Sequence, residues 1–208
     1  MNEATHGSRS KLQLWLIIGL TAAVFFGAFL IVPKSEEERL KLLESLGTSN
    51  RGTLLSPTVS IAALPITTDG ESMSWQALRP KWRILLPVAG GCTEACKDML
   101  YLTRQVHIRL DKKTHRVERV LLNTGSPLDD ESRQFLEKEH PYLKRITAKP
   151  ETFSELLSET NAQWHMHSGK FFLVDQAGQI MMFYGPENDG GDLLADLRHL
   201  LKYSAEAK

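Results

Sequence analysis

The only two cysteines in the 208-residue chain, Cys92 and Cys96, stand four residues apart. The apolar run at 84–88 predicts a buried strand, and Ala89-Gly90-Gly91 ends it. A helical pattern follows, so both sulfurs are expected where a strand gives way to a helix N-terminus. Unpaired backbone N–H groups and the helix dipole favour a thiolate there, and the thiolate is both the nucleophile and the metal ligand.

The C-x3-C spacing leaves several chemistries open. In a regular helix, residues i and i+4 have Cβ atoms roughly 5–6 Å apart, whereas a disulfide needs about 3.8 Å. A bridge therefore requires Cys92 to lie in the loop before the helix, which Gly90 and Gly91 permit. The sequence is compatible with a redox-active pair, with two thiolates that hold one soft metal ion, and with a static disulfide or two inert thiols.

Composition excludes some functions and bounds the domain count. The chain has 25 basic and 25 acidic side chains, so no net field attracts nucleic acid, and we expect no nucleic-acid partner. Its length accommodates one folded domain and an appendage.

The appendage is N-terminal. After a tail at 1–11, residues 12–32 form an apolar stretch long enough for a bilayer core of roughly 30 Å. A cleaved signal peptide is the alternative, but the run exceeds the usual h-region of about 7–15 residues and no A-x-A site follows. We predict a single retained transmembrane helix in the inner (cytoplasmic) membrane. Flanking charges do not decide its orientation, but the short tail favours a C-terminal domain on the periplasmic, extracytoplasmic side.

Residues 33–57 are predicted to form a juxtamembrane helix and a linker. Ser35 can cap the helix with Glu38 at capping-box spacing, and three leucines form one stripe. A spacer is the simplest interpretation, and a docking helix for a membrane partner is the alternative.

Residues 58–208 are predicted to form the folded domain. We expect strands at 61–64, 73–75, 84–88, 117–122, 142–146, 171–174 and 180–184, and helices after Cys92 and at 126–139, 150–157 and 192–201. This order predicts an α/β fold, a mixed sheet with helices on both faces. The cysteines would lie at the carboxyl end of a central strand, where open α/β sheets place their sites.

The layout is thioredoxin-like and resembles the Sco/SenC family of membrane-anchored copper-insertion proteins. The likeness covers roughly Thr58 to Tyr203 and rests on the N-terminal anchor, on Asp69-Gly70 ahead of the C-x3-C strand, and on His167-Ser168 five residues before Phe172-Leu173. Thr93 and Lys97 replace the prolines that usually follow each cysteine, and 123–127 lacks the expected acidic, arginine-containing run. The chain therefore resembles a diverged member.

The resemblance implies a copper site made by Cys92, Cys96 and His167. Two thiolates and an imidazole suit Cu(I) and Cu(II), although the same set could hold zinc. His165 is interpreted as a bystander. Met166, Met181 and Met182 are expected in the core, and four further histidines are expected at the surface: His107, His115, His140 and His199.

The resemblance also implies a function in assembly of cytochrome c oxidase, with its copper-site subunit as partner. The chain would deliver copper to the binuclear site or reduce its thiols, as an assembly factor more than an enzyme. Two alternatives stay open: a membrane-tethered thiol–disulfide oxidoreductase that uses Cys92 and Cys96, and a non-catalytic oxidase-associated protein with a degenerate site.

Overall fold

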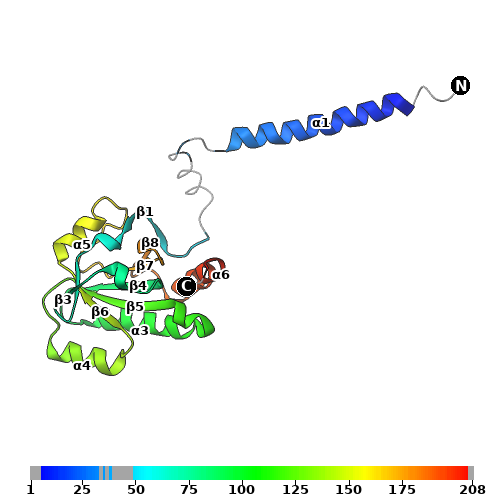
Figure 1. Ribbon diagram of the computed structural model, residues 1–208. Coiled ribbons are helices and arrows are strands. Elements are labelled where there is room, and N and C mark those ends of the chain that lie inside the picture. Colours follow the sequence, from blue (N-terminus) through cyan, green and yellow to red (C-terminus); the bar gives the residue numbers. More distant parts are fainter. Residues whose placement is uncertain (1–5, 33–34, 36–37, 39–48, 206–208) are drawn as a thin grey trace. The chain divides into compact units, whose positions relative to one another are not determined.

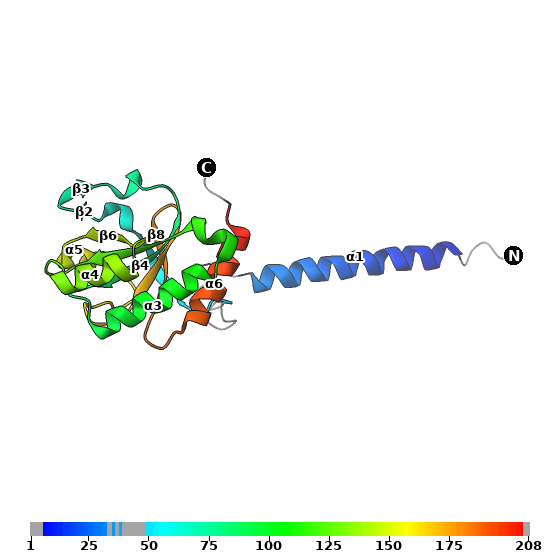
Figure 2. The ribbon, with the colours of Figure 1, turned by 90° about the horizontal axis from the view of Figure 1, so that it is seen from below.

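The computed structural model describes residues 6–32, 35, 38 and 49–205. By its contacts the chain divides into two compact units, Met1–Ser49 and Asn50–Lys208. The second unit contains all eight strands that the structure describes, and Figures 1 and 2 show it from two directions.

The first unit contains helix α1, His6–Ile31. Its large apolar side chains are exposed, including Leu20 and Phe25. Within the residues that the structure describes, no helix is both long enough and apolar enough to span a bilayer. Ser35 accepts a hydrogen bond from Glu38 N over 3.2 Å, as a helix cap would. The remainder of the predicted juxtamembrane helix lies outside the described residues.

One mixed sheet of eight strands forms the frame of the second unit, in the order β1-β8-β7-β4-β5-β6-β2-β3. Strand β4 pairs with β5 in parallel and with β7 in antiparallel register, and β5 pairs with β6 in parallel. The strands are β1 Thr53–Ser60, β2 Ile66–Thr68, β3 Glu71–Met73, β4 Trp82–Val88, β5 Val117–Asn123, β6 Lys144–Thr147, β7 Phe171–Val174 and β8 Gln179–Tyr184. The strand that leads to the cysteines, β4, is therefore central, as predicted.

Helices cover both faces of this sheet (Figure 2). They are α3 Glu94–Ile108, α4 Asp130–Glu139, α5 Pro150–Leu157 and α6 Gly190–Tyr203, with 3-10 turns η1 Ile61–Ala63, η2 Trp75–Ala77 and η3 Asp111–Arg116. Alternate residues of β4 enter two different cores: Ile84 and Leu86 pack with α3 and α6, and Leu85 packs with α5 and the first two 3-10 turns. The predicted α/β fold, a mixed sheet with helices on both faces, is confirmed.

The structure differs from the sequence prediction near the start of the domain. Residues 53–60, of which 53–57 were interpreted as linker, form β1 against β8. The predicted strand at 61–64 is instead η1, because the hydroxyl of Ser60 accepts a hydrogen bond from Ala62 N and turns the chain. The Asp69-Gly70 turn does join a hairpin, β2 to β3, and both residues have positive φ.

Candidate functional site

A disulfide joins Cys92 and Cys96 at the carboxyl end of β4, with their Cα atoms 5.2 Å apart. Cys92 lies in the loop and Cys96 lies in the first turn of α3, as the spacing argument required. Thr93 caps the helix: its hydroxyl accepts a hydrogen bond from Cys96 N over 3.4 Å. Both cysteines are buried, with 9% of Cys92 and 6% of Cys96 exposed.

The loop before Cys92 is held by Asn123, the last residue of β5. Its side-chain oxygen accepts hydrogen bonds from Gly90 N at 3.0 Å and from Gly125 N at 3.1 Å. Gly90 has φ +91°, a conformation that favours glycine. A Cβ on Gly125 would lie 2.5 Å from the carbonyl carbon of Ala89, so the two loops touch backbone to backbone.

A second contact connects the cysteine loop to α4. The buried hydroxyl of Ser132 accepts a hydrogen bond from Cys92 N over 2.8 Å. Ser132 N in turn donates to Asp129 Oδ1 over 2.7 Å, which makes Asp129 the cap of α4. Hydrogen bonds from the backbone and side chain of Ser132 lower the pKa of the Asp129 carboxyl, so it stays ionised at neutral pH.

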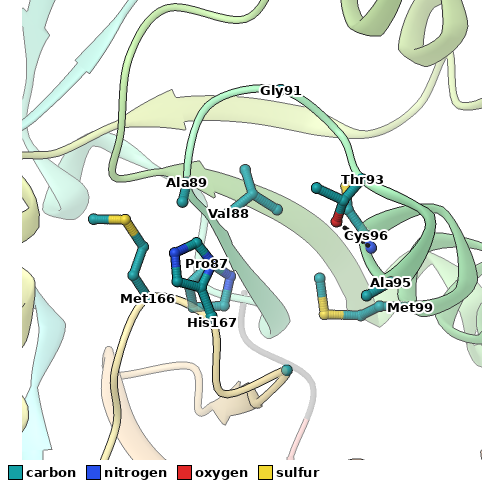
Figure 3. Close-up of a pocket in the computed structure, with 11 residues that line it drawn as sticks. Pro87, Val88, Ala89, Gly91, Thr93, Ala95, Cys96, Met99, Met166 and His167 are labelled. Atoms are coloured by element: carbon teal, nitrogen blue, oxygen red, sulfur yellow. Dashed lines mark hydrogen bonds between the residues drawn. The ribbon is translucent and has the colours of Figure 1, made fainter.

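On its other side the disulfide borders a cavity of about 170 Å³. Cys96 and Met99 line it from α3, and His167 and Met166 line it from the loop that precedes β7. Figure 3 shows His167 beside Pro87 and Ala89, across the cavity from Cys96. The β4–β7 pairing brings His167 to the cysteine end of the sheet, but in this disulfide form His167 and Cys96 lie on opposite walls of the cavity.

The other predicted residues lie only in part where they were expected. His165, His115 and His199 are exposed, and Met181 and Met182 pack in the core, as expected. Met166 is not a core residue: it is 37% exposed, because its loop lies over the cavity. His140 is not a surface residue: it packs edge-on against the ring of Phe135 and is 6% exposed. His107 is half-buried, and its ring bonds to the carbonyl oxygen of Val117 over 2.9 Å.

The donor set fits copper only when the two cysteines are reduced. Sulfurs joined in a disulfide are not thiolates, and thiolates are the metal ligands. Accordingly, in the described part of the chain no three His, Cys, Asp or Glu side chains are grouped closely enough to share a metal ion. Reduction would release two thiolates next to a cavity that already contains an exposed imidazole, a soft-to-borderline set that suits copper.

Sequence reasoning missed Asn123, Asp129 and Ser132, which shape the cysteine loop. They lie some distance along the chain from Cys92, at the end of β5 and at the start of α4. One signal was present: Asp129 ahead of the polar turn 130–132 is typical of an N-cap. It would have placed the start of α4 at 130 and not at the predicted 126.

Comparison with solved structures identifies the fold. Apo Sco1 from Thermus thermophilus is 16% identical, with a TM-score of 0.56 over 74% of this chain and 99% of that chain. Copper-bound ScoI from Arabidopsis thaliana is 20% identical, with a TM-score of 0.52 over the same shares of the two chains. BsSco, a member of the Sco family of cytochrome c oxidase assembly proteins in which a disulfide switch was identified, is 14% identical with a TM-score of 0.53, over 71% of this chain and 96% of that chain. At these identities the likeness shows a shared fold.

Curated proteins gave no match to this sequence. The family profile described as "Transmembrane-like, thioredoxin-like, C-terminal domain" matches residues 82–204, more than half of the chain, from the first residue of β4 to the end of α6. With its Sco-like fold and its disulfide at the end of β4, the chain belongs to this thioredoxin-like family.

Proposed function

We propose that this protein is a copper-binding accessory factor for the assembly of cytochrome c oxidase, and that it binds copper only in its dithiol form. The observation that carries the proposal is the cavity where Cys96 and His167 line opposite walls at the carboxyl end of β4. Copper would be cargo, held by the thiolates of Cys92 and Cys96 and by the imidazole of His167. The Sco fold, seen with copper bound in one structure and with a disulfide switch in another, supports this assignment.

The surroundings of the site suit an exchange of metal more than permanent storage. Both sulfurs are buried, whereas His167 is exposed and lies in a loop that contains Gly169 at φ +65°. A ligand on such a loop can approach the sulfurs or withdraw with little effect on the sheet. We infer that release of copper begins with His167.

The proposal also includes the setting. Residues 12–32 would anchor the protein in the inner membrane, with the Asn50–Lys208 unit on the extracytoplasmic side. That compartment permits disulfides to form. The copper-site subunit of the oxidase would be the partner.

Thiol reduction is the second candidate, favoured by one observation. Cys96 lies in the first turn of α3, where its thiolate would be stabilised by the helix N-terminus. A reductant of this kind would exchange its dithiol for the disulfide of the oxidase subunit: the two cysteines here would be oxidised and the two there reduced.

Titration with Cu(I) against a competing chelator tests the first proposal. The sample is the Asn50–Lys208 unit, which contains the whole sheet and both cores, in its reduced and oxidised forms. Only the reduced form should compete for copper, and Cys92→Ser with Cys96→Ser should abolish binding. His167→Ala should weaken binding by about tenfold or more, about 1.4 kcal/mol. His165→Ala, two residues away and also exposed, serves as the matched control.

The outcomes separate the candidates. Copper binding that is the same in wild type and in the double cysteine variant would exclude a copper function. If wild type binds no copper but reduces a model disulfide peptide stoichiometrically, the reductant assignment replaces it. Equal losses in the two histidine variants would show that His167 is not a specific ligand.

A further inference from the structure

A second cavity, of about 190 Å³, lies away from the disulfide, between the second half of α3 and the end of α4. Charged and titratable side chains dominate its lining: Arg104, His107, Arg119, Glu139 and His140. The proposed copper function uses none of them. Cys96 and Met99, in the first half of α3, line the first cavity, so the two cavities lie along different halves of that helix.

Arg119 is the central feature of this cavity. Its side chain comes from β5, and the residue is 6% exposed. It donates from Nε to the hydroxyl of Thr103 at 3.2 Å and from Nη2 to the carbonyl oxygen of Leu100 at 2.8 Å. Both partners are neutral, and among the described residues no carboxylate forms an ion pair with it. A buried cation without an anionic partner is costly, since buried charges are normally paired.

The remaining groups set the charge of the cavity. Arg104 adds a second positive charge, and its Nη1 lies 3.9 Å from Glu139 Oε2, a half-exposed pair. His107 and His140 are neutral at pH 7, because burial lowers the pKa of each and that of His140 falls to about 4. The net charge is therefore +1, from two guanidinium groups and one carboxylate, and the partial negative ends of α3 and α4 reduce it further. Such a site matches a single negative charge better than a dianion.

His140 supplies a second, independent sign that a group is missing. Its Nδ1 is buried and has no hydrogen-bond partner in the described structure. Buried polar atoms are nearly always paired, so each exception calls for an explanation. A bound oxygen acceptor or donor in the cavity would provide one.

The rim of the cavity is apolar and exposed. Tyr142 is 94% exposed and Ile108 is 58% exposed, and both line the opening. Large apolar side chains on the rim favour a ligand that carries an apolar carbon chain next to its charged group.

From these observations we propose that this cavity binds one carboxylate group attached to a short apolar chain, with Arg119 and Arg104 as its cationic partners. A guanidinium group presents paired N–H donors that match the two oxygens of a carboxylate. Ile108 and Tyr142 would cover the attached carbon chain. A free short-chain carboxylate and a glutamate side chain of a polypeptide present the same chemistry.

The pKa of His140 gives a direct readout of binding. Burial lowers it first, and repulsion by Arg119 and Arg104 lowers it further. A carboxylate bound between these arginines would neutralise part of that repulsion, so the pKa of His140 should rise. A ligand that binds anywhere else would leave it unchanged.

The test uses the full chain in a non-ionic detergent, with histidine rings labelled for NMR. Butyrate, the peptide Ac-Ala-Glu-Ala-NH2 and inorganic phosphate are added separately up to about 50 mM, a range that detects millimolar affinity. We expect butyrate or the glutamate peptide to raise the pKa of His140, while exposed His199 reports only general salt effects. The glutamine version of the peptide should have no effect, and the more effective of the two carboxylates identifies the source.

Variants keep the test independent of folding. Arg104→Gln changes a half-exposed residue and should weaken binding by about tenfold, and Arg109→Gln, at the cap of the same helix and outside the cavity, is the matched control. Arg119→Lys keeps the charge but loses the paired donors, so it should also bind more weakly. The proposal is overturned if no carboxylate moves the pKa of His140, if Arg104→Gln responds like Arg109→Gln, or if phosphate is the strongest ligand.

Discussion

Ser132→Ala tests whether the start of α4 holds the cysteine loop. The substitution removes the only described acceptor of Cys92 N, at 2.8 Å, and leaves that buried N–H without a partner. Such a loss costs about 1–3 kcal/mol. Alanine is the better helix former by up to about 0.5 kcal/mol, which offsets part of the cost. The free energy of unfolding should fall by about 0.5–2.5 kcal/mol, or about 1–10 °C in melting temperature for a domain of this size.

The assay is urea unfolding of the oxidised Asn50–Lys208 unit, followed by circular dichroism. Ser154→Ala is the matched control, because Ser154 lies at the exposed face of α5 and measures the helix-propensity gain alone. The expected result is a lower midpoint for Ser132→Ala and an equal or higher midpoint for Ser154→Ala. If the two variants have the same stability, the Cys92–Ser132 bond does not support the loop and the reasoning is refuted.

Three further predictions follow from the structure. In the reduced protein one thiol should be alkylated at pH values well below about 8.5, the ordinary pKa of cysteine, because the α3 N-terminus favours the thiolate. Alkylation rates that rise only at about pH 8.5 would contradict this prediction. Gly125→Ala should destabilise the domain by about 1–3 kcal/mol, since its Cβ would lie 2.5 Å from the Ala89 carbonyl carbon and the cysteine loop must shift; an unchanged urea midpoint would show that the loops can separate freely. Burial lowers the pKa of His140 from 6.5 to about 4, so between these pH values the unfolded chain binds more protons than the folded one, and stability should fall as the pH drops from 6.5 to about 4. His140→Gln should flatten this dependence of the urea midpoint on pH. Equal slopes in the two proteins would show that another group causes the acid sensitivity.

The sequence predicted those elements whose apolar pattern is strong. Strands β4, β5, β7 and β8 and helix α5 lie close to where periodicity placed them. Strand β1 was missed in part because Thr53–Ser60 is mostly exposed and contains Pro57, so its pattern is that of a loop. It forms a strand because its backbone pairs with the edge of β8. Since β8 lies far along the chain, this pairing leaves no signal in the local sequence of β1.

For the site, local sequence predicted the position of the sulfurs but not their supports. The prediction that Cys92 lies in a loop needed only the two glycines, Gly90 and Gly91, before the helical pattern. Asn123 and Ser132 reach that loop from later elements, so only the assembled sheet reveals their contacts. The burial of His140 was missed for a related reason: a single histidine in a polar segment has no periodic partner to show which way it faces.

One carboxylate binds the first residues of the domain to its last helix. Asp196 of α6, 4% exposed, accepts hydrogen bonds from Arg51 N, Gly52 N and the hydroxyl of Tyr184. The segment that the family profile recognises begins only at residue 82. Cut out by itself, that segment would keep Asp196 but lose two of its three donor residues, and without β1 the strand β8 would become an unprotected edge open to aggregation. The segment that the family profile recognises is therefore smaller than the unit that these hydrogen bonds and the sheet complete, and we expect any stable fragment to need both Arg51 and β1.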